Sequence, residues 1–420
     1  MAMTQATDPQ KSCSTSAQNP SIEVADILRE HIAEYQSQYP LLPHQYKIVY
    51  DLLNCRTPYL GGHVEQCDGC GAQRITYNSC RNRHCPKCQT SSRQRWLKAR
   101  KAEILPVPYF HAVFTLPHAL NPIILGNKRI MLNILFSSVA ETLLSFGLEP
   151  KNALGGKLGF MAILHTWDQQ LKPHFHLHCL IAGGVMTVDG KGWKLCRNDY
   201  LFNEEALGLV FRGKFIEALL KAYQSGTLSF PGILAPYEKA TRLHKLKDSL
   251  YVHNWVVSVR KPLRRPELVL QYLGRYTHRV AISNHRIVAL KDGMVTFTYR
   301  NRKTNQIVPI TITAVEFIRR FLLHALPQGF VRIRHFGFLT NRSKRVNLAR
   351  IRRLFGLSPQ SHEAVEQTLQ EMILMLTGID LTICPHCKKG KMQHLREIPR
   401  YSGISAKEII RPPASRRAAA

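Results

Sequence analysis

The stretch Lys172-Pro-His-Phe-His-Leu-His178 decides how this sequence is interpreted. Successive side chains on a β-strand point to opposite faces, so His174, His176 and His178 share one face of the predicted strand. Neutral imidazoles at that spacing are poor core material and good metal ligands. A hydrophobic residue separates each histidine from the next, and the apolar run 179–182 continues the strand. This pattern favours a metal-binding strand over a solvated histidine run or a chance histidine-rich edge.

The residues before this strand predict its partner in a β-hairpin that spans about 157–185. The apolar run Gly159-Phe-Met-Ala-Ile-Leu-His165 precedes a polar turn that begins at Asp168. A third metal ligand could come from His165, from Asp168 or from His174. We favour His165, because an antiparallel hairpin can bring it opposite the histidine pair.

The composition indicates a polyanion as partner. Of the 420 residues, 58 are Lys or Arg and 28 are Asp or Glu, which gives a formal net charge of +30. Such a charge indicates the kind of partner that the protein binds rather than its fold, and the usual partner of a strongly basic protein is nucleic acid. A membrane surface is the competing polyanion, but the best candidate span, 129–148, is interrupted by polar residues and predicts an amphipathic helix. The first 20 residues are polar without a hydrophobic signal core, so we expect a cytoplasmic protein with no membrane partner.

Eleven cysteines in a cytoplasmic protein favour metal binding over disulfides. Two CxxC knuckles stand at the spacing of a zinc ribbon or finger, and their four thiolates predict a tetrahedral Zn²⁺ site at Cys67, Cys70, Cys85 and Cys88. Cys80 and His84 lie in the same stretch, so the ligand set could be permuted, or a second ion could be present.

A third knuckle near the carboxyl end has no obvious second pair in the sequence. We therefore hypothesise a second zinc site that joins the two ends of the chain, made of Cys80, His84, Cys384 and Cys387. The isolated cysteines are expected to be ordinary buried or loop thiols, namely Cys13, Cys55, Cys179 and Cys196.

Hydrophobic periodicity and turn residues predict an α+β chain without internal repeats. Helices are expected at 23–37, 43–54, 91–104, 127–146, 203–223, 266–276 and 341–353. Besides the hairpin, strands are expected at 109–117 and 251–259, with short strands between 286 and 312.

Tyr272 and Tyr276 are four residues apart in a predicted helix, which places both hydroxyls on one face. Two tyrosines at this spacing are usually packing residues. The neighbouring Arg275 and Arg279 make the setting electropositive and suited to a phosphate.

These motifs together resemble the HUH endonucleases, and specifically the two-tyrosine rolling-circle insertion-sequence transposases of the IS91 type. His176-Leu-His178 is similar to the His-hydrophobic-His element of that class, and Phe114-Thr-Leu-Pro117 to its first-strand motif. The stretch 272–284 resembles the two-tyrosine motif, 79–89 the amino-terminal zinc module, and the carboxyl-terminal CPxC knuckle also matches. The sequence departs from the pattern at Phe175, where the family leads us to expect proline, and at 261–266, where it leads us to expect a glycine-rich turn.

The resemblance implies an antiparallel HUH sheet with flanking helices, an amino-terminal zinc ribbon or finger module and a helical, basic carboxyl-terminal region. It implies a bacterial, nucleoid-associated transposase that cleaves and transfers single-stranded DNA at mobile-element ends through 5′-phosphotyrosine intermediates. Tyr272 and Tyr276 would be the nucleophiles, His176, His178 and His165 would hold Mg²⁺ or Mn²⁺, and zinc would be structural. Zinc at the histidines is the alternative.

The domain boundaries expected on this basis are a disordered tail at 1–22, a helical segment with the zinc module at 23–92, the nuclease domain at 93–312, a helical basic region at 313–380, and a CxxC knuckle with a tail at 381–420. The DNA-binding candidates are Arg275, Arg279, Arg342, Lys344 and Arg345. Two rival functions are a replication initiator or relaxase of the same class, and a zinc-dependent DNA-binding regulator without catalysis.

Overall fold

The structure is a computed structural model. It describes residues 22–400 apart from 153, 198, 266, 267, 270, 271, 273, 275, 278, 302, 360–370, 372, 373, 375–379 and 381, and apart from the side chains at 89–92, 95 and 98. The expected disordered tail at 1–22 falls outside the described residues except for Ile22, and the expected tail at 401–420 falls outside them entirely.

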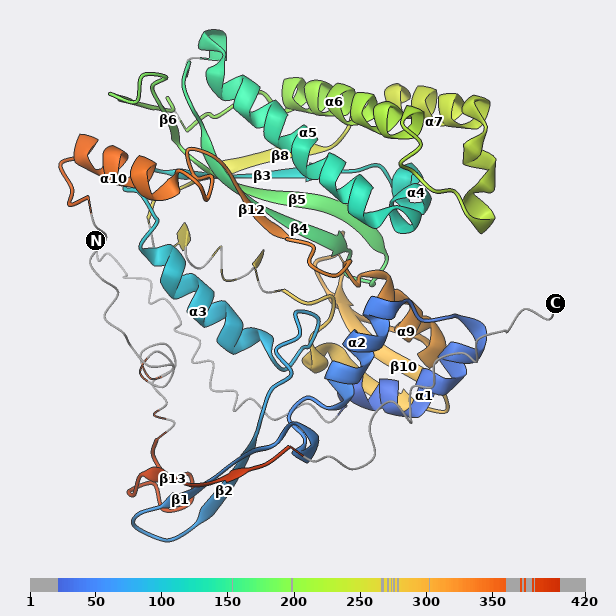
Figure 1. Cartoon of the computed structure of the whole chain (residues 1–420), viewed down its shortest axis with the longest axis vertical. Helices are drawn as coiled ribbons and strands as arrows, with labels where there is room; N and C mark the ends of the chain where they lie inside the picture. Colours follow the sequence, from blue (N-terminus) through green and yellow to red (C-terminus); the bar gives the residue numbers. More distant parts are fainter. Residues whose placement is uncertain are drawn as a thin grey trace, which may run out of the picture.

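An antiparallel five-stranded sheet forms the centre of the fold, in the order β12-β4-β5-β3-β8 (Figure 1). In sequence order its strands are β3 (Tyr109–Thr115), β4 (Gly159–Trp167), β5 (Pro173–Ala182), β8 (Val257–Leu263) and β12 (Ile333–Gly337). The histidine strand is therefore the middle strand, with the other arm of the predicted hairpin beside it. The α+β class and the central histidine strand are both confirmed.

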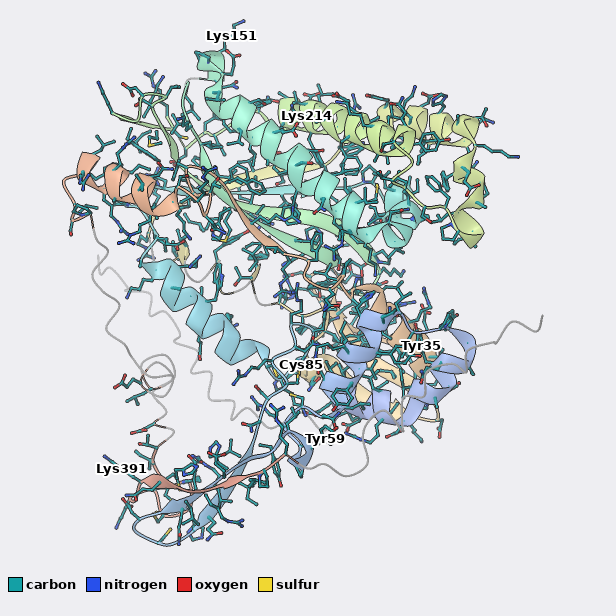
Figure 2. The ribbon with its side chains drawn as sticks, in the orientation of Figure 1. Tyr35, Tyr59, Cys85, Lys151, Lys214 and Lys391 are labelled. Atoms are coloured by element: carbon teal, nitrogen blue, oxygen red, sulfur yellow. The ribbon has the colours of Figure 1, made fainter. Side chains whose placement is uncertain are left out.

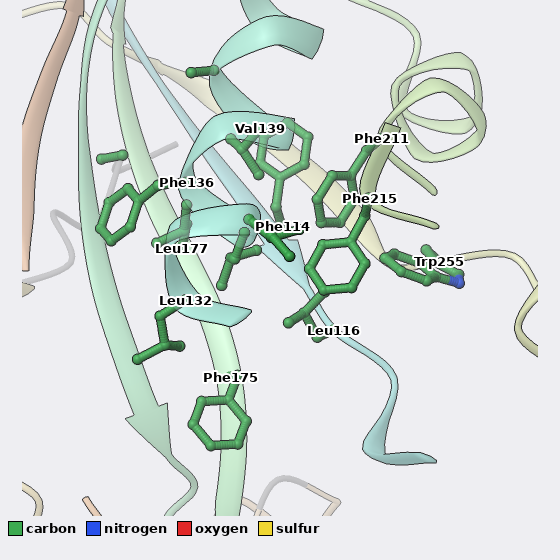
Figure 3. Packing of buried hydrophobic residues seen from close by; sticks show 14 of the residues in the cluster. Phe114, Leu116, Leu132, Phe136, Val139, Phe175, Leu177, Phe211, Phe215 and Trp255 are labelled. Carbon is green, nitrogen blue, oxygen red and sulfur yellow. The ribbon is translucent and has the colours of Figure 1, made fainter. Parts of the chain in front are cut away.

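One face of the sheet is covered by helices. These are α4 (Asn121–Gly126), α5 (Lys128–Leu148), α6 (Glu204–Gln224) and α7 (Ala240–Val252). Figure 3 shows Phe114 of the sheet beside Phe211 and Phe215 of α6, and Leu177 and Phe175 farther along the same core near Phe136 and Leu132 of α5. Phe175, which replaces the expected proline, is 1% exposed. Its ring points into this core, away from the histidine face, so the departure from the family pattern leaves the histidines free.

The opposite face carries the alternate residues of the same strands. Tyr109, Met161, Ile163 and Leu180 pack there in a second apolar cluster with residues of the tyrosine segment. We use that name for residues 268–276, of which 268, 269, 272, 274 and 276 are described and are helical. This face also carries the histidines, so the period of two along β5 separates the core from the site.

Two further units flank the sheet (Figure 1). One packs helices against a small antiparallel sheet around its own core, and consists of α1 (Val24–Gln38), α2 (Pro43–Leu53), β9 (Ile287–Lys291), β10 (Met294–Arg300), β11 (Ile307–Thr313) and α9 (Ala314–Leu323). The other is a three-stranded sheet in the order β13-β1-β2, made of β1 (Gly62–Cys67), β2 (Gln73–Tyr77) and β13 (Met392–Ile398). The remaining elements are α3 (Gln89–Lys101), β6 (Gly184–Met186), β7 (Trp193–Leu195) and α10 (Lys344–Leu354).

The strand expected at 251–259 is placed differently in the structure. Helix α7 continues to Val252, and β8 begins only at Val257. Leu243, Leu246 and Leu250 are buried at helical spacing, and this periodicity carries the helix into the apolar run that suggested a strand.

Segments distant in sequence also join the units. Strand β12, beyond residue 312, is an edge of the central sheet. Strand β13 pairs with β1, and α9 packs against α1. Local sequence patterns do not identify such long-range partners, because strand pairing depends on tertiary context.

Of the described helices, α5 is the one long and apolar enough to cross a membrane. Most of its apolar window is buried against the sheet and α6, as is usual for a core helix. Its apolar composition therefore has a structural explanation, and the helix is more deeply buried than the amphipathic helix that we expected.

Candidate active site

Three histidines converge on the face of the central sheet that lies opposite helices α4 to α7. His165 of β4 lies directly opposite His176 of β5 in the antiparallel register, and His178 follows two residues along the same face. All three are buried, and one ring nitrogen from each lies within 4.8 Å of the others. The ring centroids of His165 and His178 are 4.5 Å apart, and those of His176 and His178 are 4.9 Å apart. We call this set the histidine triad.

Hydrogen bonds fix which nitrogens of the triad can bind a cation. His176 Nδ1 donates to the carbonyl oxygen of His174 over 2.9 Å, and His165 Nε2 donates to that of Tyr276 over 2.8 Å. Each ring therefore keeps its other nitrogen as a lone-pair donor. His176 Nε2 and His178 Nε2 are 3.1 Å apart. Two nitrogens on one ion at right angles stand about 3 Å apart, so the pair fits a shared metal.

The third ring is oriented by a histidine that the sequence did not single out. His111 of β3 places its Nε2 2.9 Å from His178 Nδ1. When His178 Nδ1 donates this bond, its Nε2 lone pair faces His176. His111 lies on the strand predicted at 109–117 and on the same face as the triad, so strand alternation was the signal that could have found it.

Burial keeps these rings neutral. It lowers the pKa of His165 to about 3 and that of His111 to about 4. Burial, followed by the neighbouring charge of His165 when protonated, also lowers the pKa of His178. Neutral imidazoles at pH 7 are the form that binds metal. With three imidazoles and no carboxylate, the set suits Mn²⁺ better than Mg²⁺.

The two alternative third ligands have other roles. Asp168 Oδ1 accepts hydrogen bonds from the backbone amides of Gln170 and Lys172, both over 2.8 Å, and so caps the hairpin turn. The ring of His174 lies on the triad face but bonds with His118 over 3.2 Å. The structure brings together the favoured set of His165, His176 and His178.

The two tyrosines of the tyrosine segment lie beside the triad but in different surroundings. The Tyr276 ring is 4.5 Å from the His178 ring and 5.9 Å from the His165 ring. Tyr272 is 9% exposed. Its ring packs against the rings of both Tyr276 and His111, with centroid distances of 4.5 Å to each. The expected glycine-rich turn before this segment is replaced by the end of β8, and the tyrosines still reach the triad face.

Arginines surround this site. Arg332 donates to the carbonyl oxygens of Thr277 over 2.7 Å and of Arg279 over 3.2 Å, which ties down the chain after Tyr276. Arg279 is exposed and close enough to the triad for its charge to contribute, after burial, to the lowered pKa of His165. A phosphate bound here would therefore meet positive charge. Arg332, near the start of β12, carried no signal in the sequence.

The other DNA-binding candidates lie apart from one another. Arg275 falls outside the described residues. Arg342 and Arg345 are exposed at the start of α10. Lys344 instead pairs with Glu103 over 2.6 Å in a partly buried ion pair that Arg100 shares, so its ammonium group is engaged within the protein.

The cysteines form two groups of four, and neither is the predicted one. Cys67 and Cys70 meet Cys384 and Cys387, whereas Cys85 and Cys88 meet Cys55 and Cys80. The expectation that Cys67, Cys70, Cys85 and Cys88 share one ion is therefore wrong, because β1 pairs with β13 and brings the carboxyl-terminal knuckle to the first one. Figure 2 labels Cys85 of the second group near the start of α3, and Lys391, which precedes β13, at the separate β13-β1-β2 sheet.

Two further predictions about ligands are corrected. His84 does not join either thiol group among the described residues; its ring is half-buried near Arg332, and desolvation lowers its pKa to about 3. Cys55, expected to be an ordinary thiol, completes the second group, with its Sγ 3.4 Å from Cys88 Sγ. It has no CxxC partner, so spacing gave no signal for it.

Both groups fit zinc. Four sulfurs around a Zn²⁺ with bonds of about 2.3 Å lie about 3.8 Å apart. The measured separations are 3.7 Å for Cys67 and Cys387 and 3.6 Å for Cys80 and Cys88. Gly390 leaves room for the first group, because a Cβ there would lie 2.4 Å from Cys67 Sγ. We name these the end-joining group (Cys67, Cys70, Cys384, Cys387) and the helix-start group (Cys55, Cys80, Cys85, Cys88).

We expect the purified chain to hold two zinc ions. Changing Cys384 and Cys387 together to Ser should remove one, because a CxxC pair alone leaves the end-joining ion with two ligands. Elemental analysis of protein purified without added metal gives the count. A value of one per chain in the wild type, unchanged by the double substitution, would contradict two separate sites.

Comparisons with known proteins agree with these features. A family model described as "Putative transposase" matches residues 159–346, and one described as "Transposase zinc-binding domain" matches residues 27–116. A Sinorhizobium fredii protein named "Putative transposase y4qJ" is 43% identical over 88% of this chain and 94% of its own length. The transposase for insertion sequence element IS801 of Pseudomonas savastanoi pv. phaseolicola is 28% identical over 69% of each chain.

Among solved structures, the conjugative relaxase TrwC in complex with oriT DNA and copper aligns with 59% of this chain and 93% of its own. The identity is 14% and the TM-score 0.21, values too low to establish a shared fold.

Proposed function

This chain belongs to the IS91-type transposases, and on that premise we propose that it cleaves single-stranded DNA at the ends of a mobile element and transfers the strand through 5′-phosphotyrosine intermediates, by a rolling-circle route. The observation that carries the proposal is the position of Tyr276 beside the histidine triad, 4.5 Å from the His178 ring.

A phosphodiester resists attack because its anionic oxygens repel a nucleophile and the transition state gathers charge. Mg²⁺ or Mn²⁺ bound at His165, His176 and His178 would polarise the scissile phosphate as a Lewis acid. The chain itself supplies the tyrosine nucleophile, and Arg279 beside it carries positive charge for the phosphate. The ester energy is kept in the phosphotyrosine bond, so strand transfer needs no nucleotide cofactor.

The positive charge around the site supports a DNA partner. Arg279 near the triad, Arg342 just before α10 and Arg345 on α10 would contact phosphates. Such contacts release counterions, so binding should weaken steeply as salt rises. The zinc groups are structural in this proposal, and the protein would act in the bacterial cytoplasm on the nucleoid.

The test is the formation of a covalent protein–DNA adduct. Labelled single-stranded oligonucleotides that tile the DNA flanking the coding sequence of this chain are incubated with the full protein and Mn²⁺ or Mg²⁺, and resolved on a denaturing gel. We expect a retarded band that requires the metal and disappears with EDTA. DNA binding across the whole tile with no adduct in either metal would contradict the proposal and favour the non-catalytic regulator.

A further inference from the structure

The two tyrosines differ in their access to a phosphate. Tyr272 belongs to the apolar cluster between the sheet and the tyrosine segment, whereas Tyr276 lies at the margin of that cluster. The Tyr272 hydroxyl is buried and has no hydrogen-bond partner among the described residues. Its ring contacts His111 and Tyr276, and burial raises the pKa of its phenol. In this arrangement a DNA strand cannot reach Tyr272.

Tyr276 is held beside the triad through two successive backbone carbonyls, its own and that of the next residue. Its carbonyl oxygen accepts the hydrogen bond from His165 Nε2, so a triad member holds the backbone that carries this tyrosine. Arg332 holds the next carbonyl, that of Thr277, over 2.7 Å. The tyrosine that is more exposed is therefore also the one anchored beside the candidate metal site.

We propose that the two tyrosines act in a fixed order: Tyr276 makes the first cut, and Tyr272 is held in reserve until the tyrosine segment moves. The order rests on the proposed function. In the first step the Tyr276 phenol oxygen bonds to phosphorus while the bond from phosphorus to the 3′ oxygen breaks. The phenol loses its proton and the released 3′ oxygen gains one, so no further reactant is needed.

The Tyr272 hydroxyl adds nothing to the packing of its ring, because it has no hydrogen-bond partner among the described residues. A buried hydroxyl without a partner is unfavourable, and a catalytic role is one of the explanations for such a group in a native structure. Phenylalanine would fill the same space without that group. We therefore expect Tyr272→Phe to melt at the same temperature as the wild type or higher, an outcome that a phenol needed for folding would not give.

The sequence provides a direct way to read the order. Trypsin cleaves after Arg275, which separates Tyr272 on peptide 265–275 from Tyr276 on peptide 276–279. The full protein is mixed with excess tiled single-stranded oligonucleotide and Mn²⁺, quenched within one turnover, and digested with nuclease and trypsin. Mass spectrometry then locates the nucleotide adduct.

We expect at least about tenfold more first-turnover adduct on peptide 276–279. Tyr276→Phe should slow the first cut by about 1000-fold, whereas Tyr272→Phe should still form the first adduct on peptide 276–279 and lose the second cut. The control Tyr200→Phe should cut within about twofold of the wild type. Tyr200 is 56% exposed and lies outside the site. Adduct mainly on 265–275, or equally on both peptides, would overturn the order and leave the proposed function standing. No adduct on either peptide would overturn both the order and the proposed function.

Discussion

Replacing His178 by Ala is expected to lower the rate of single-strand cleavage by about 1000-fold, since losing several kcal/mol of transition-state stabilisation has an effect of that size. His178 is the triad member whose ring lies within 5 Å of the rings of His165, His176 and Tyr276. Its loss leaves two imidazoles for the metal and removes the ring that faces the tyrosine. Mn²⁺ binding, measured by isothermal titration, should weaken by at least about 100-fold.

The matched control for this variant is His174→Ala. His174 is the same residue type on the same strand face. Its backbone carbonyl accepts from His176 Nδ1 and its ring lies 4.7 Å from the His176 ring, but it does not belong to the group of nitrogens that could hold the metal. Its ring bonds with His118 outside the triad. We expect its cleavage rate and Mn²⁺ affinity to stay close to those of the wild type. Equal losses in both variants, or none in His178→Ala, would contradict the triad as the metal site.

The double substitution Tyr272→Phe and Tyr276→Phe is expected to abolish the covalent adduct and to reduce cleavage by more than about 1000-fold. Both phenyl rings keep the packing against His111 and the apolar cluster, while no phenol remains to attack phosphorus. Binding of the same oligonucleotide should change by less than about twofold, because phosphate contacts come from Arg and Lys. Fluorescence anisotropy measures binding, and the denaturing gel measures cleavage.

A double Phe protein that still cleaves would show that another group, such as a metal-bound water, is the nucleophile. Thermal unfolding provides the check on folding. Tyr272 has no hydrogen bond from its hydroxyl in the described structure, so its removal should not lower the melting temperature.

The sequence was most informative where a short period determines geometry. Alternation along β5 placed His176 and His178 on one face, and hairpin pairing placed His165 opposite them, as the register His165–His176 shows. The same alternation sent Phe175 and Leu177 into the core. These relations depend on neighbours along one strand or across one tight turn, so local sequence carries them.

The sequence was least informative where partners come from far along the chain. Cys55 and Cys384 complete their thiol groups only because α2 ends beside the second knuckle and β13 pairs with β1. Arg332 reaches the end of the tyrosine segment from the region before β12, more than 50 residues along the chain. The burial of Tyr272 likewise follows from packing of its segment on the central sheet, where its ring meets that of His111 of β3, rather than from its four-residue spacing to Tyr276.

The claim that the histidine triad holds the working metal beside Tyr276 can be tested most directly by locating Mn²⁺ in crystals of the zinc-loaded wild-type protein, from anomalous scattering above and below the manganese edge. The account predicts one manganese peak bound by the imidazoles of His165, His176 and His178, on the side of the triad that faces Tyr276. Manganese bound elsewhere while the triad stays free of it, or zinc that Mn²⁺ cannot replace at these three rings, would contradict it.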